Sequence, residues 1–139
     1  MGTESAYLSK SEASARMGTA AEYLVAAVCI LATAGELNVS TSLVDDEGVD
    51  LVFHRRGSTA TLAVQVKARM STGKHFQDGR ILTDVSVKTF RPRPGLDILV
   101  VAVDVERGAI DTAWLVPSPV FAEMVAIPTP RGSCGFQRL

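Results

Sequence analysis

The chain has 139 residues, of which 47% are apolar and 21% are charged. This length suits one domain, and the apolar content is sufficient for a hydrophobic core, which excludes a wholly disordered chain. The longest apolar stretch, residues 23–34, is shorter than a bilayer span, and Cys29 and Cys134 form neither a metal-ligand spacing nor a disulfide framework. We therefore expect a cytoplasmic protein that has no membrane partner.

The net charge of −1 conceals a basic middle. Residues 54–93 hold nine Lys or Arg and two Asp, so this window carries +7 and the rest of the chain carries −8. A basic segment within an acidic chain is typical of a phosphate-binding face. The alternative is a set of solvated loop and strand-edge side chains. The predicted nucleic-acid-binding residues are Arg55, Arg56, Arg69, Lys74, Lys88, Arg91 and Arg93.

The first predicted element is a helix. Residues 1–10 are expected to form a flexible leader, and from Ser11 to Ala34 apolar residues recur at steps of three and four, which indicates one helical face. Gly35 is expected to end the helix, because glycine readily takes the left-handed conformation that follows many helices.

Strands are predicted after the helix, from alternating or continuous apolar runs bounded by turn residues. We expect strands at 37–44, 49–54 and 60–68, the last two joined through the turn "RRGST". Residues 70–80 are expected to form a loop. The pattern of 81–90 fits either a strand or a short helix.

The second half is expected to supply two more strands and a helix. Residues 96–104 form an almost continuous apolar run, which favours a central strand covered on both faces. Another strand is predicted at 112–116, and Ser118 and Pro119 are typical of an N-cap and a first helical residue. The tail, 128–139, is expected to be irregular.

This order of elements predicts a single α/β domain over residues 11–127. It runs helix, three strands, an ambiguous element, two strands and helix, and we expect a mixed central sheet flanked by helices.

Polar side chains interrupt the second and third predicted strands. Alternation places Gln65 and Lys67 on one face, while Val64 and Val66 point the other way and can pack on a helix. If the two strands pair through their turn, Asp50 lies beside Gln65 and Lys67. These three side chains are candidates for a functional site.

The predicted helix adds an acid to this set. Glu22 lies in the apolar middle of the helix, where Gly18, Ala26 and Cys29 are its neighbours on the same face. A buried carboxylate is costly unless a cation, a metal or hydrogen bonds compensate it. We therefore include Glu22 among the candidates.

The order of these residues resembles the PD-(D/E)XK nuclease superfamily, which has the restriction-endonuclease-like fold. That pattern is an acid in the first helix, an Asp at the second strand and an acid-x-Lys in the third. Here the segments are "GTAAE" (18–22), "GVDLVF" (48–53) and "VQVKA" (64–68). The chain departs from the pattern at Val49, where Pro is common, and at Gln65, which makes the third motif Gln-x-Lys.

The resemblance implies a restriction-endonuclease-like core of the form αβββ(α/β)ββα and a metal-dependent endonuclease. Asp50, Glu22 and Gln65 would bind Mg²⁺ or Mn²⁺, the carbonyl of Val66 would assist them, and Lys67 would orient the attacking water or neutralise developing charge. The substrate would be DNA rather than RNA, and a homodimer or a larger protein partner is expected.

Other roles are open for the same residues. Asp50 could cap the turn before its strand, Lys67 and Gln65 could be surface residues of a strand, and Glu22 could pair with Arg16 or Arg69. The alternative function is a catalytically weak or inactive nuclease-fold module that binds nucleic acid or assembles with a protein. A third alternative, an α/β domain that binds a small molecule or a cyclic nucleotide, lacks support, because the sequence has no Gly-rich phosphate loop.

Overall fold

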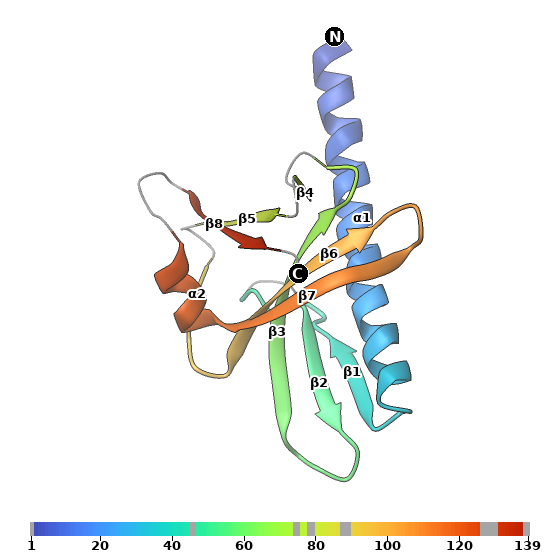
Figure 1. The fold of residues 1–139 in the computed structure, drawn as a ribbon, viewed down its shortest axis with the longest axis vertical. Helices are drawn as coiled ribbons and strands as arrows, with labels where there is room; N and C mark the ends of the chain where they lie inside the picture. The colour runs from blue at the N-terminus through green and yellow to red at the C-terminus, as the bar shows by residue number, and fades with distance from the viewer. Residues whose placement is uncertain are drawn as a thin grey trace.

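The computed structural model describes residues 2–44, 47–73, 76–77, 80–86, 90–125 and 131–137, and side chains within part of these ranges. Figure 1 shows a long helix beside a twisted sheet, with a smaller sheet and a short helix on the other side. The elements in chain order are α1 (Gly2–Ala32), β1 (Leu37–Thr41), β2 (Leu51–Arg55), β3 (Thr61–Met70), β4 (Phe76–Gln77), β5 (Arg80–Ser86), β6 (Leu96–Asp104), β7 (Ala109–Pro117), α2 (Ser118–Met124) and β8 (Arg131–Gln137).

The larger sheet is mixed, as the sequence predicts. Its strand order is β1-β2-β3-β6-β7, and neighbouring strands are antiparallel except for β3 and β6, which are parallel. A parallel pair needs a long crossover connection, and here β4 and β5 lie in it. Residues 81–86 of the ambiguous segment form β5 together with Arg80. The molecule is an α/β fold with a mixed sheet flanked by two helices.

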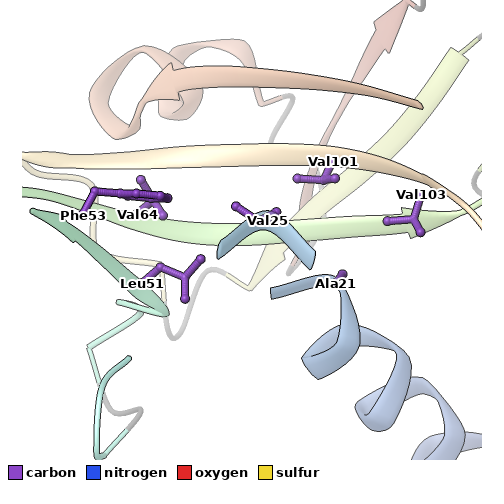
Figure 2. Packing of buried hydrophobic residues seen from close by; sticks show 7 residues of the cluster. All are labelled: Ala21, Val25, Leu51, Phe53, Val64, Val101 and Val103. Atoms are coloured by element: carbon purple, nitrogen blue, oxygen red, sulfur yellow. The ribbon is translucent and has the colours of Figure 1, made fainter. Parts of the chain in front are cut away.

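Both faces of the larger sheet carry a core. On one face α1 packs on β2, β3 and β6, and Figure 2 shows this cluster: Ala21, Val25, Leu51, Phe53, Val64, Val101 and Val103. On the other face a second cluster joins β6 to β5 and α2, and its buried members are Ile81, Ile98, Val100, Ala102, Phe121 and Val125. Strand β6 is thus covered on both faces, which confirms the prediction from its continuous apolar run.

A second sheet has the order β4-β5-β8. Residues 131–137, expected to be irregular, form β8 and pair antiparallel with β5, and residues 76–77 of the expected loop form β4. Both predictions were wrong for these residues. Strand β8 holds Gly132, Ser133, Cys134 and Gly135, which have little intrinsic strand propensity, so its structure depends on a partner about fifty residues earlier in the chain.

The structure also changes two predicted helix boundaries. Helix α1 already begins at Gly2, so residues 2–10 are helical instead of a loose leader. At its other end Gly35 is left-handed, with φ of 82°, and its N–H donates to the carbonyl of Ile30 at 2.9 Å. The helix thus ends at Ala32, two residues before the predicted end. Ala34, with φ of 50°, also closes the cap, because its N–H donates to the carbonyl of Leu31 at 3.1 Å. Only the left-handed conformation predicted for Gly35 is confirmed.

Ser118 does not cap α2, contrary to the prediction. Pro117 occupies the N-cap position, and no side-chain cap bond is formed there. The buried hydroxyl of Ser118 instead accepts the N–H of Arg93 and donates to the carbonyl of Arg93, each at 2.9 Å. Ser118 therefore fixes the loop before β6 against the start of α2.

Helix α1 is unusually apolar for a helix with one exposed side. Residues 12–32 are long and apolar enough to cross a membrane by length and composition alone, and within them only Ala21 and Val25 are buried. The core helix of a non-membrane protein can pass the same test. In this fold the inner side of α1 places Ala21 and Val25 in the core.

Candidate functional site

Strand β3 extends beyond its neighbour β2. Strand β2 pairs with residues 61–64 of β3, whereas β6 pairs with β3 from Ala63 to Met70. Residues 65–70 therefore pair with β6 on one side, whereas β2 does not pair with them on the other. This end of β3 holds both Gln65 and Lys67.

Asp50 directly precedes β2 and occupies the place where that strand would continue. Its N–H donates to the carbonyl of Val64 at 2.9 Å, and its carboxylate oxygen Oδ2 accepts the N–H of Val66 at 2.7 Å. The carboxylate substitutes for a missing strand partner, since it satisfies a main-chain donor that β2 does not reach. Asp50 thus lies against the main chain between Gln65 and Lys67.

The carbonyl of Val66 faces the same edge as Asp50. In a strand, the N–H and C=O of one residue point to the same side. Because the N–H of Val66 points to Asp50, the carbonyl oxygen of Val66 points to the same edge of β3, which β2 does not cover. A carboxylate and a main-chain carbonyl therefore border one short stretch of strand edge.

Gln65 and Lys67 project from the face of the sheet that is opposite α1. Val64 is fully buried in the cluster beneath α1 and Val66 packs against that cluster, which confirms their predicted orientation. Alternation then sends Gln65 and Lys67 to the other face, where their β6 partners in the register are Ile98 and Val100. Both side chains are half-buried.

Gly48 packs closely on Gln65, a contact that sequence reasoning missed. A β-carbon added to Gly48 would lie 3.5 Å from Oε1 of Gln65, and the φ of Gly48 is 76°, a left-handed value that favours glycine. The chain before Asp50 thus lies beside the Gln65 amide. The glycine that follows "DDE" in the sequence was the available signal.

Glu22 belongs to α1. It is half-buried and lies one helical turn after Gly18. Gly18 lines a cleft of about 360 Å³ between α1 and the end of β3, together with Ala68 and Arg69. Asp50 therefore lies at the edge of β3 between Gln65 and Lys67, whereas Glu22 belongs to the helix that covers the opposite face of the sheet from these two side chains.

The donor atoms suit a hard cation. Asp50 and Glu22 offer carboxylates, Gln65 an amide oxygen and Val66 a carbonyl, and Mg²⁺ typically uses one or two carboxylates with water completing its shell. No group of three or more His, Cys, Asp or Glu that could hold a metal occurs among the described residues. The chemistry fits Mg²⁺ or Mn²⁺ and does not fit zinc, which prefers Cys and His.

The predicted nucleic-acid-binding residues lie in separate places. Arg55 and Arg56 are exposed at the β2–β3 hairpin, and Arg69 lies eight residues beyond Thr61, about 26 Å along an extended strand. Arg91 and Arg93 lie in the loop before β6, and Lys74 and Lys88 fall outside the described residues. The described arginines thus form no single patch.

Arg93 connects the loop before β6 to the chain near Asp50. Its Nη2 donates to the carbonyl of Glu47 at 3.3 Å and lies 3.9 Å from a carboxylate oxygen of the same residue. Through its main chain, Arg93 also bonds to Ser118. Arg93 therefore has a structural role, and Arg91, two residues before it, is exposed.

Cys29 is a packing residue of the core beneath α1. Burial raises the pKa of its thiol, so the thiol stays protonated at neutral pH, and the protonated form is a poor nucleophile. Its place beside Leu37 and Phe53 under α1 accounts for it as a packing residue.

Comparisons of the chain with models of known protein families, with curated proteins and with solved structures gave no match. A function must therefore be argued from Asp50, the end of β3 and the residues around them.

Proposed function

We propose that the chain is a metal-dependent nuclease-like domain that hydrolyses phosphodiester bonds in DNA, in the manner of the PD-(D/E)XK superfamily. The observation that supports this most is the 2.7 Å hydrogen bond from the Val66 N–H to the Asp50 carboxylate. This bond holds the Asp50 carboxylate against the Gln-x-Lys segment, at an edge of β3 that β2 does not cover. A buried core strand has no need of this arrangement of acid, amide and amine.

Each residue has a defined part in this proposal. Asp50, Glu22 and Gln65 would hold Mg²⁺ or Mn²⁺, with the Val66 carbonyl as a further oxygen donor. Such an ion, when bound, polarises the phosphate and provides hydroxide at neutral pH. The ammonium of Lys67 stabilises the negative charge that develops on the phosphate oxygens. The amide of Gln65 contributes no charge, so metal affinity should be lower than with a third acid.

The second candidate function is a module of the same fold that binds nucleic acid or a protein without cutting. The neutral Gln65 favours it, as does the absence, among the described residues, of a group of three metal-binding side chains of the usual types. Where the module binds nucleic acid, the two candidates predict the same binding and differ in cleavage.

An assay on labelled DNA separates these functions. Single-stranded and double-stranded DNA, and RNA of the same sequence, are incubated with the protein and Mg²⁺, Mn²⁺ or EDTA. The nuclease proposal expects metal-dependent cleavage of DNA, and in the Lys67→Met variant a loss of at least about 100-fold with binding retained. Retarded but uncut DNA under every metal condition would establish the binding module in its place.

A further inference from the structure

A mostly apolar cavity lies on the α1 face of the larger sheet, beside the last turns of α1. Its volume is about 360 Å³, which is within the range of sites that hold small molecules. Phe53 and Val64 form part of its lining, and Figure 2 shows them at the end of the core cluster opposite Ala21. The cavity is therefore separate from Gln65 and Lys67, which project from the other face of the sheet.

The lining of this cavity comes from α1 and from every strand of the larger sheet. Leu37 belongs to β1 at one edge of that sheet, and Leu115 belongs to β7 at the other edge. Neighbouring strands are about 4.8 Å apart, so the four intervals from β1 to β7 amount to about 19 Å. A small cavity that reaches side chains from so many strands is long and narrow, which suits an extended chain better than a compact ring system.

Leu115 leaves the apolar lining incompletely covered. Its side chain is 52% exposed, and among the described residues of the five strands it is the only large apolar side chain that is exposed. Its partner in the register, Leu99, also lines the cavity and is half-buried. A ligand in the cavity would remove apolar surface of both residues from water, which is favourable.

Among the described residues, Arg55 is the only charged one in the lining. It is exposed, and its side chain makes no hydrogen bond or ion pair with the part of the chain that the structure describes. Glu36 lines a neighbouring cleft together with Arg55, but these two described residues form no ion pair. Strand register places Arg55 opposite Leu37, at the β1 end of the cavity. A guanidinium at this place can receive a carboxylate through two parallel hydrogen bonds.

We propose that this cavity binds a small carboxylate with a linear aliphatic chain, of the chemical class of a medium-chain fatty acid. The carboxylate pairs with Arg55, and the chain lies over Phe53 and Val64 toward Leu115. Apolar walls with a single cation at one end match a molecule that has one charged head and an apolar body. This site goes beyond the proposed function, because it requires neither a metal nor cleavage.

A free acid fits the cavity better than a peptide or a membrane does. An extended peptide would place its N–H and C=O groups against mostly apolar walls, where unpaired polar groups are costly to bury. An anionic bilayer is usually bound through several Lys or Arg on one face, whereas Arg55 is the one cation among the described residues of this lining. A free carboxylate requires only that arginine.

Calorimetric titration with decanoate and decanamide, each below the concentration at which it aggregates, tests the head group. The natural protein should bind decanoate about tenfold more tightly, since hydrogen bonds between charged groups are the stronger ones. Arg55→Met should remove this preference. Arg56→Met is the matched control, at an exposed residue that does not line the cavity, and should keep it. In the natural protein, the absence of saturable decanoate binding, or equal affinity for the two compounds, would overturn the proposal.

A second pair of variants tests the position of the chain. Leu115→Asp should raise the Kd for both compounds by about tenfold, because a charge then lies beside the apolar end of the ligand. Val120→Asp, at an apolar residue of α2 that is 45% exposed, is the control and should leave both Kd values unchanged. Melting temperatures check that every variant is folded. An unchanged Kd in Leu115→Asp, or binding to phosphatidylcholine vesicles in preference to decanoate, would refute this assignment.

Discussion

The carboxylate of Asp50 has to meet two demands. Its Oδ2 accepts the Val66 N–H and so completes the end of the β2–β3 ladder, and the proposed metal site uses the same group. These demands are compatible because an ionised carboxylate has about four lone-pair sites. At Gln65 there is no such charge, although its amide lies against Gly48 in a defined position. Within the proposed site, Asp50 therefore carries a negative charge and Gln65 does not.

Replacing Gln65 by Glu tests whether this position faces the metal. Gln65→Glu should increase the rise in melting temperature caused by Mg²⁺ and increase cleavage, because a third carboxylate strengthens metal binding. Without metal the variant should melt at a lower temperature than the natural protein, because three nearby acids repel one another.

Thermal melts with and without Mg²⁺ measure both effects, and Asn38→Asp, at an exposed residue of β1, is the matched control. Equal Mg²⁺ shifts in Gln65→Glu and the natural protein would show that residue 65 does not bind the ion.

At the scale of elements, sequence patterns predicted the features that residues close together in the sequence determine. The apolar run of β6, the alternation in β3 and the left-handed Gly35 each confirmed a prediction. Strand β8 could not be predicted, because its partner β5 is remote in sequence and its own residues do not favour a strand. The Asp50–Val66 contact depends on where β2 begins, and boundaries of this kind are weakly encoded. Ser118 had the residue type of an N-cap, but the carbonyl and N–H of Arg93 bind its hydroxyl instead.

Strand β8 should contribute to the stability of the whole domain. It pairs with β5, whose Ile81 is fully buried in the core cluster beneath α2. A chain ending at residue 130 should therefore melt at least about 5 °C below the full chain. A chain ending at residue 137 keeps β8 and is the control. Equal melting temperatures for all three chains would show that the second sheet is dispensable.

At the scale of the whole molecule, the separated arginines should contribute unequally to nucleic-acid binding. Arg91 lies in the loop that Arg93 ties to Glu47, near Asp50, whereas Arg56 lies at the distant β2–β3 hairpin. We expect DNA affinity to fall steeply with salt concentration, since contacts to phosphates release counterions.

Arg91→Glu should weaken DNA binding and reduce the salt slope by about one, and Arg56→Glu should have a smaller effect. Titrations of labelled DNA at several salt concentrations measure both quantities. Affinity that ignores ionic strength, or equal losses in the two variants, would argue against a binding surface around Asp50.

The most direct test of the proposed site is metal-dependent cleavage by the Asp50→Asn variant. An amide oxygen at this position can still accept the Val66 N–H, so the variant should keep its melting temperature without metal while losing the charge that would bind Mg²⁺. The control is Asp104→Asn, because Asp104 also accepts a main-chain N–H, that of Arg107 at 3.1 Å, in a turn between β6 and β7. We predict that Asp50→Asn loses both the Mg²⁺-induced rise in melting temperature and DNA cleavage, whereas Asp104→Asn keeps them. A folded Asp50→Asn variant that retains both would contradict the account.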